Sequence, residues 1–61
     1  MTWRERVRAD IKREQWALSD AHERVKDALH YQRPKSWTTM WRERVAYHER
    51  EIARLVALLL K

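Results

Sequence analysis

The chain has 61 residues, and its 14 Lys and Arg against nine Asp and Glu give a formal net charge of +5 at pH 7. A chain of this length forms one small domain, whose core is marginal unless disulfides, a metal ion or oligomerisation add stability. It has no cysteine, which excludes disulfides, thiolate metal sites and a cysteine nucleophile. Its longest run of apolar residues covers residues 55–60, far fewer than the roughly 20 that a membrane-spanning helix needs.

The composition also indicates a cellular location and a kind of source. Residues 4–8 include four charged side chains, which is unlike the apolar segment of a secretory signal. We therefore expect a soluble cytoplasmic protein, or a virion-associated one if the gene belongs to a phage. Ten of the 14 cations are arginine, and this bias, with many Ala, Val, Leu and Trp residues, is typical of GC-rich bacterial or phage genes.

The first half of the chain predicts a helix over about residues 2–31. Thr2 and Glu5 match a capping box, in which a threonine hydroxyl and a glutamate satisfy free backbone amides at a helix start. Apolar residues then recur at spacings of three, four and seven, which places them on one face. This stripe holds Trp3, Val7, Ile11, Leu18, Val25 and Leu29. A second heptad column is small or polar, which lets a partner helix approach closely; it holds Val7, Glu14, Ala21 and Ala28.

Pro34 is the only proline and predicts a turn over about residues 32–36, because proline disfavours a helical residue before it. A second helix is predicted over about residues 37–60, with Ser36 or Thr38 as its N-cap. Its apolar positions alternate by four and three, as in a coiled-coil seam. The seam holds Trp41, Val45, His48, Ile52, Leu55 and Leu59. Additional apolar residues near the end of this helix, Val56, Leu58 and Leu60, exceed what one neighbouring helix would cover.

Two periodic segments and one break predict an all-α fold, namely a single antiparallel αα-hairpin over residues 1–61. Because each helix of a hairpin buries only one face, we expect the chain to dimerise into a four-helix bundle with coiled-coil packing. The residues expected in the core or at the association surface are Ile11, Leu18, Val25, Leu29, Trp41, Val45, Ile52, Leu55, Val56 and Leu59.

Trp16 and two rows of cations are the candidate partner-binding residues. Trp16 projects away from the apolar stripe among acidic neighbours, which suits a protein partner or a second interface within the oligomer. The cations, spaced four residues apart, could follow a nucleic-acid backbone. They could equally form a solvated face with ion pairs such as Arg6–Asp10 and Asp20–Arg24. The rows consist of Arg4, Arg8 and Lys12 and of Arg50 and Arg54.

The pentapeptide Trp-Arg-Glu-Arg-Val occurs twice, at residues 3–7 and 41–45. Both copies fall early in a predicted helix, with the tryptophan one turn before a valine. We expect each tryptophan to cover one end of the core, the alternative being a repeated surface that a two-fold partner recognises.

His48, His22 and Glu14 are the candidates for metal binding or acid–base chemistry. We expect His48 and His22 to reach similar heights in the hairpin, with Glu14 pointing inward. The Glu-x-x-His and His-Glu-x-x-His spacings of known metal sites do not occur, so we expect no metal and no cofactor. Polar groups at such positions would instead fix the register of the helices.

Catalysis has no motif to support it, because the chain lacks a glycine-rich phosphate loop and a nucleophile–base set. The sequence therefore predicts a small non-catalytic helical-hairpin protein that self-associates and binds a macromolecular partner, with a protein partner favoured. Two alternatives stay open: a nucleic-acid-binding regulator that uses the basic rows, and a structural subunit of a larger assembly such as a phage virion. The nine acidic residues disfavour action at a membrane surface.

Overall fold

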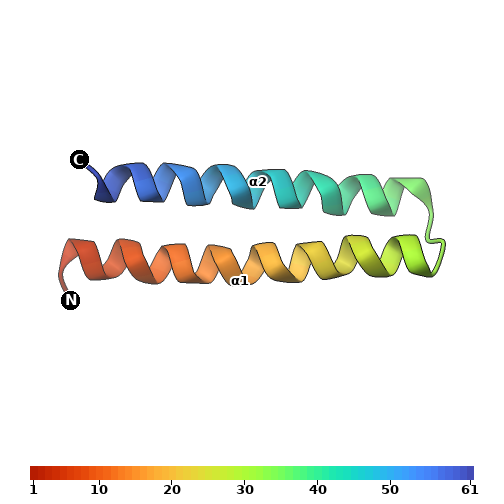
Figure 1. The fold of residues 1–61 in the computed structure, drawn as a ribbon, viewed down its shortest axis with the longest axis horizontal. Coiled ribbons are helices and arrows are strands. Elements are labelled where there is room, and N and C mark those ends of the chain that lie inside the picture. The colour runs from red at the N-terminus through yellow and green to blue at the C-terminus, as the bar shows by residue number, and fades with distance from the viewer.

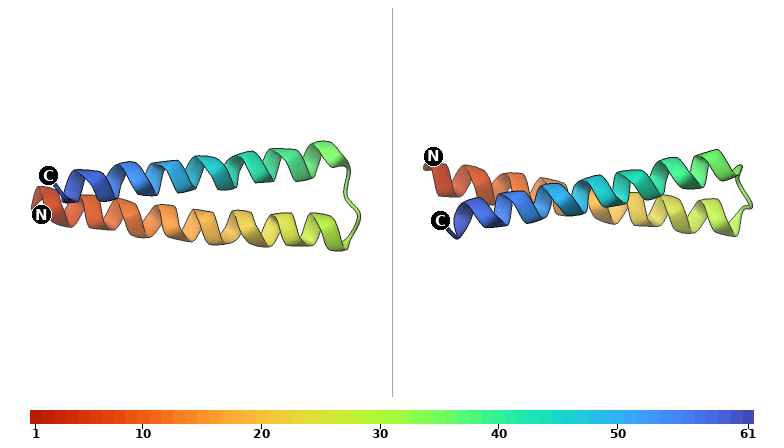
Figure 2. Two further views of the ribbon diagram at one scale, coloured as in Figure 1. Left: turned by 45° about the horizontal axis from the view of Figure 1, so that its top comes forward. Right: turned by 90° about the horizontal axis from the view of Figure 1, so that it is seen from above.

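The protein is a hairpin of two long helices, described for all 61 residues by a computed structural model. Helix α1 spans Trp3–His30 and helix α2 spans Lys35–Leu59. The helices lie side by side and antiparallel, with both termini at one end and the connection at the other (Figure 1). They cross at a shallow angle, as in coiled coils (Figure 2). The predicted all-α hairpin is thus confirmed, and it measures 45 × 16 × 11 Å.

Helix α1 begins at the predicted cap. Thr2 has an extended backbone, and its hydroxyl oxygen accepts a hydrogen bond from the Glu5 N–H at 3.2 Å. This bond satisfies one of the amide donors that a helix start leaves free. The backbone carbonyl of Thr2 accepts a further bond from the Arg6 N–H at 3.1 Å. The Glu5 side chain does not return a bond to the Thr2 N–H, so only the threonine half of the predicted capping box is formed.

Helix α1 ends in a Schellman motif that has no glycine. The Arg33 N–H donates to the Ala28 carbonyl at 2.8 Å, and the Gln32 N–H donates to the Leu29 carbonyl at 3.4 Å. This geometry requires a left-handed residue, and Gln32 takes that conformation with φ 52°. A side chain with a Cβ is disfavoured there, so the position is a local source of strain.

Helix α2 begins earlier than residue 37, and the predicted caps are wrong. Pro34 is the N-cap residue and has no side-chain capping bond; its carbonyl accepts from the Trp37 N–H at 2.9 Å. Pro34 can occupy this position because it precedes the helical hydrogen bonds and needs no N–H there. Thr38, one of the two expected caps, is instead buried against α1 at 7% exposure.

A contact between Glu14 and His48 sets the register of the hairpin. One heptad from this pair, in opposite directions along the antiparallel helices, lie Val7 and Leu55 toward the termini. One heptad the other way, Ala21 lies opposite Trp41. These are the central positions of the interface, which explains why Val7, Ala21 and Leu55 are buried. The small-or-polar column of the first helix is thus where α2 packs most closely.

Two residues expected in the core are outside the contact between the helices. Leu29 is 56% exposed and Val56 is 39% exposed. Each directly follows a central residue of its helix, Ala28 or Leu55, and therefore points sideways from the interface by about a quarter turn. The helical repeat predicts one apolar face on the first helix, and α2 covers only the edge of that face nearest to it.

Candidate interaction surfaces

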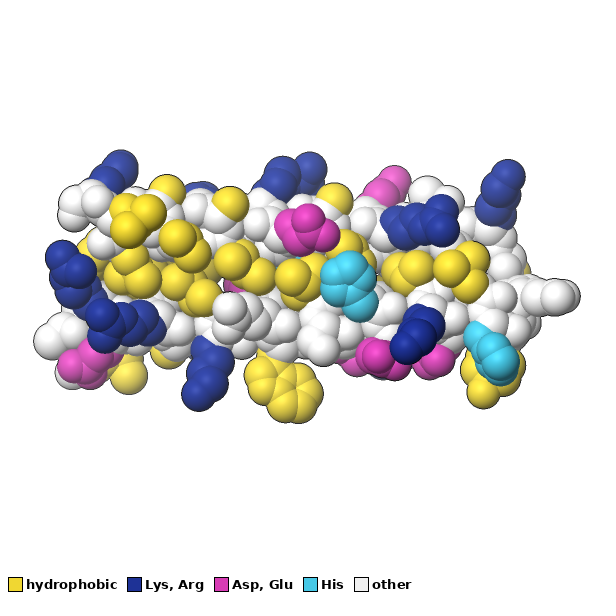
Figure 3. Space-filling model, viewed as in Figure 1, with side chains coloured by type: hydrophobic (Ala, Val, Ile, Leu, Met, Phe, Trp, Pro, Cys, Tyr) yellow, Lys and Arg dark blue, Asp and Glu magenta, His cyan; other side chains and the backbone are white.

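One side of the hairpin carries an apolar face, seen in Figure 3 as yellow side chains along the line between the helices, with a histidine lying across them. Residues four positions after the central residues point to this side on both helices, because the helices are antiparallel. All six of them are half-buried, since the opposite helix covers only part of each side chain. The apolar face consists of Ile11, Leu18, Val25, Val45, Ile52 and Leu59. Leu29 and Val56 extend it at its outer edges.

On the opposite side of the hairpin, the charged face, most positions three residues after the central ones hold ionic side chains, beside the half-buried Ala17 and Leu58. The ionic residues are Asp10, Arg24, Arg44 and Glu51. Asp10 pairs with Arg13 at 3.7 Å and Arg24 pairs with Asp20 at 3.6 Å. The expected Asp20–Arg24 pair is therefore confirmed, whereas Asp10 pairs with Arg13 and not with Arg6. Asp10, Arg24 and Glu51 each have an ion-pair partner on their own helix, and Arg44 lies over the Trp41 ring, so this side of the hairpin is more polar than the apolar face.

Trp41 occupies a central position of the contact between the helices and lies level with Ala21, whose small side chain leaves room for the indole. The guanidinium carbons of Arg24 and Arg44 lie 5.1 and 5.6 Å from the centre of the ring. Both contacts are in the range of cation–π attraction. The indole nitrogen Nε1 is buried and has no hydrogen-bond partner. The tryptophan is thus held by arginines from both helices.

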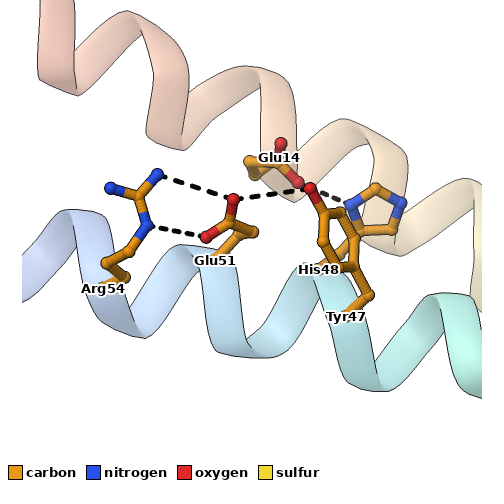
Figure 4. A network of polar contacts seen from close by, with 5 residues as sticks. All are labelled: Glu14, Tyr47, His48, Glu51 and Arg54. Atoms are coloured by element: carbon orange, nitrogen blue, oxygen red, sulfur yellow. Dashed lines mark hydrogen bonds and ion pairs between the residues drawn. The ribbon is translucent and has the colours of Figure 1, made fainter.

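The one polar side-chain contact between the helices joins His48 to Glu14. His48 Nδ1 lies 2.5 Å from Glu14 Oε2, and the side chains are 16% and 24% exposed (Figure 4). The imidazole donates to the carboxylate in the tautomer that carries its proton on Nδ1. His22 was expected near this height, which is wrong, because the register places residue 22 more than two turns from His48. A polar pair between apolar neighbours favours one alignment of the helices.

A second polar cluster lies on α2 beside this pair (Figure 4). Arg54 donates to Glu51 through Nε at 2.7 Å and through a terminal nitrogen at 3.5 Å. The Tyr47 hydroxyl donates to the same carboxylate at 3.4 Å. The hydrogen bond from Arg54 lowers the pKa of the Glu51 carboxyl. Because Arg54 is engaged in this way, it is less available for an external phosphate than the sequence suggested.

The other candidate partner-binding residues are all exposed. Trp16 is 76% exposed and borders a shallow hollow lined by Lys12, Gln15, Trp16 and Ser19. It projects from the side of α1 that faces away from α2. The row Arg4, Arg8 and Lys12 and the single Arg50 are exposed and form no ion pair within the chain. The exposed side chains of all these residues are therefore accessible to a partner molecule.

The two copies of Trp-Arg-Glu-Arg-Val occupy different positions in the interface. In the first copy Val7 is central and 5% exposed, while Trp3 is 54% exposed. In the second copy Trp41 is central, and Val45 lies on the apolar face. The expectation that each tryptophan covers one end of the core fails for Trp3. The copies share a sequence but not an environment.

No three His, Asp or Glu side chains of the chain converge on a point that could hold a metal ion. Neither helix combines the length and the apolar character that crossing a membrane requires. Comparison with known proteins found no matching protein family, no matching curated protein and no matching solved structure.

Proposed function

We propose that this chain is a non-catalytic assembly protein whose apolar face binds a second copy, giving a homodimeric four-helix bundle. The assembled bundle presents Trp16 to a protein partner. The observation that carries the proposal is the apolar face itself, which runs along the hairpin and has no cover (Figure 3).

The amount of exposed surface supports this proposal. The hairpin exposes 5195 Å², whereas a compact monomer of 7.6 kDa exposes about 4,300 Å². The radius of gyration is 14.1 Å, against about 10.5 Å for a globular chain of this length. The excess of about 900 Å² is close to the roughly 800 Å² that each partner buries in a standard protein–protein interface. A second hairpin on the apolar face would remove surface of this size.

The small core supports it as well. Only four hydrophobic residues are buried, two of them alanines, and no large side chain is fully buried. Apolar burial is the main favourable term in folding, and a domain that buries so little is marginal alone. When two copies cover each other's apolar faces, each chain buries its six half-buried aliphatic side chains. This burial stabilises the dimer by about 25 cal/mol for each Å² of apolar surface removed from water.

Binding of a protein partner is proposed for the back of α1. Trp16 points away from α2 and remains accessible when a second copy covers the apolar face. Exposed tryptophan is enriched among the residues that dominate protein interfaces. The proposed division of labour is assembly through the apolar face and partner contact through Trp16.

The test is a pair of substitutions in the last turns of α2. Val56→Glu places a charge at the edge of the apolar face without entering the contact between α1 and α2. Ala57→Glu places the same charge one residue later, on the exposed back of α2. Light scattering should show that Val56→Glu is monomeric and that Ala57→Glu has the mass of the native protein. Equal masses for the two variants would contradict the proposal.

A second candidate function, nucleic-acid binding, is favoured by the unpaired row Arg4, Arg8 and Lys12. Each phosphate contact would make the affinity dependent on salt. A mobility shift that weakens steeply with salt, and that disappears when the three residues are replaced by alanine, would support this candidate. A shift that the triple substitution leaves unchanged would exclude this surface.

A further inference from the structure

The proposed dimer can form in two ways, and the edges of the apolar face distinguish them. Two copies stacked face to face are related by a two-fold axis in the plane between them. If the axis runs along the bundle, both connecting loops lie at the same end, and α1 of each copy packs on α2 of the other. If it runs across the bundle, the loops lie at opposite ends, and each helix packs on its own equivalent.

The edge of the apolar face along α1 is cationic and has no carboxylate. All of its residues are exposed, and none of its cations has an ion-pair partner in the chain. The α1 edge consists of Arg8, Lys12, Gln15, Ser19, His22, Lys26 and, next to the loop, Leu29. These residues would face whichever helix of the second copy lies above α1.

The edge along α2 is mostly apolar or neutral. Glu49 is its one carboxylate and has no ion-pair partner in the chain. The α2 edge consists of Arg42, Ala46, Glu49, Ala53, Val56 and Leu60, all of them exposed. Val56 and Leu60 are 39% and 82% exposed, so this edge offers apolar surface near the termini.

The loops-at-opposite-ends arrangement brings the two α1 edges together. The middle of the hairpin lies near residue 16 of α1 and residue 47 of α2, so Arg8 and Lys12 of one copy come level with Lys26 and His22 of the other. Arg8 then meets Lys26 without a carboxylate between them, and Lys12 finds no acidic partner on the other α1 edge. Like charges across an interface oppose association and reduce its rate.

The loops-at-one-end arrangement brings each α1 edge against the α2 edge of the second copy. Lys12 lies two residues before Glu14, and Glu49 lies one residue after His48, so the two are nearly level. Arg8 comes level with the exposed Val56, and long cationic side chains can cover apolar surface with their methylene groups. The cationic edge thus meets the one free carboxylate and the apolar surface.

We propose that two copies associate with both loops at the same end, so that α1 of each copy packs on α2 of the other and Lys12 pairs with Glu49 across the interface. This rests on the proposed self-association and specifies its geometry.

The decisive experiment uses spin labels, which can be attached at single introduced cysteines because the 61 residues include no cysteine. Ser36→Cys places a label in the first turn of α2, beside the loop, and Ser19→Cys places one near the middle of α1. The proposal predicts a short distance between the two Ser36 labels of a dimer, within the bundle cross-section. A distance near the 45 Å length of the hairpin would overturn it.

The Ser19→Cys label separates this result from failure of self-association. In either arrangement two labels near the middle of the bundle lie within its cross-section. A short distance at Ser19 with a long one at Ser36 contradicts the loops-at-one-end geometry alone. If neither label reports a distance to a second copy, the protein does not self-associate, and the proposed function fails with it.

Charge reversal tests the pairing of Lys12 with Glu49. Lys12→Glu and Glu49→Lys should each weaken dimerisation by about five-fold, the size expected for a surface ion pair. The double variant should recover most of the loss, because the pair is restored with reversed signs. Losses that simply add in the double variant would contradict the pairing. Glu43→Lys, on the exposed back of α2, is the matched control and should leave dimerisation unchanged.

Discussion

His48 Nδ1 lies 2.5 Å from Glu14 Oε2 in a contact that joins the two helices and fixes their alignment. The pair is flanked by the apolar layers of Val7 with Leu55 and of Ala21 with Trp41. A slip of one helix along the other would place the carboxylate and the imidazole against apolar groups, which costs free energy in a half-buried site. The pair therefore makes one register more favourable than its neighbours.

Replacing one member of this pair should cost more than replacing both. Glu14→Leu leaves the imidazole, and His48→Leu leaves the carboxylate, without a partner in the seam; each should lower the free energy of unfolding by about 1–3 kcal/mol. Glu14→Leu/His48→Leu should be near neutral, because apolar pairs often equal buried polar ones in stability. Denaturant unfolding of the three variants measures this. A double variant that loses the sum of the single losses would show that the two side chains do not interact, and would contradict the contact.

Glycine in place of Gln32 should stabilise the hairpin. The left-handed conformation with φ 52° costs a residue with a Cβ about 1 kcal/mol, and glycine avoids this cost. Gln32→Gly should therefore raise the free energy of unfolding by up to about 1 kcal/mol. The matched control is Ser19→Gly in the middle of α1, which should lower it by about 0.5–1 kcal/mol. If both substitutions destabilise the protein, the Schellman end of α1 is not formed in solution.

Enlarging Ala21 should disrupt the contact between the helices. Ala21 is 1% exposed and lies opposite Trp41, so the extra atoms of leucine have no space. Ala21→Leu should cost about 1–3 kcal/mol of stability, as overpacking does in well-packed cores. Ala9→Leu makes the same change on the exposed back of α1 and should be almost neutral. Thermal unfolding followed by circular dichroism compares the two, and equal midpoints would contradict the register.

Much of this architecture follows from periodicity, and the rest depends on geometry that periodicity does not contain. Pro34 and the two apolar stripes predict the hairpin, and the outward position of Trp16 follows from the helical repeat. Two adjacent heptad columns of α1 could face α2. The one that does is set by the direction in which α2 leaves the turn. The apolar column of Ile11, Leu18 and Val25 suggested one answer, but the small column of Ala21 and Ala28 allows the closer approach.

The polar contacts were harder to foresee for the same reason. Moving one helix along the other by one helical turn changes every contact between them. The alignment depends on where the second helix begins, and α2 begins at Lys35 instead of residue 37. His48 consequently meets Glu14, and His22 lies at the edge of the apolar face. Asp10 is within reach of both Arg6 and Arg13. The side-chain rotamers decide which pair forms, and the spacing of charges in the sequence does not determine these rotamers.

Glu51 should make the free energy of unfolding depend on pH near pH 4. The hydrogen bond from Arg54 lowers the pKa of its carboxyl in the folded protein. A lowered folded pKa adds stability above the unfolded pKa of about 4.3 and loses it as the pH falls through the folded value. Glu51→Gln should therefore be less stable than the native protein at pH 7, with the difference shrinking below about pH 4.3. A difference that is constant from pH 7 to pH 2 would show that the ion pair contributes nothing.

The central claim is that a second copy of the chain covers the apolar face. That face consists of Ile11, Leu18, Val25, Val45, Ile52 and Leu59. The direct measurement is the mass of the native protein in solution by light scattering, across a range of micromolar concentrations. Self-association predicts a mass of twice the 7.6 kDa of one chain, which falls toward the mass of one chain on dilution. The unfolding midpoint should fall on dilution as well, because association stabilises the folded state. A folded protein of 7.6 kDa at every concentration, with an unfolding midpoint independent of concentration, would contradict the claim.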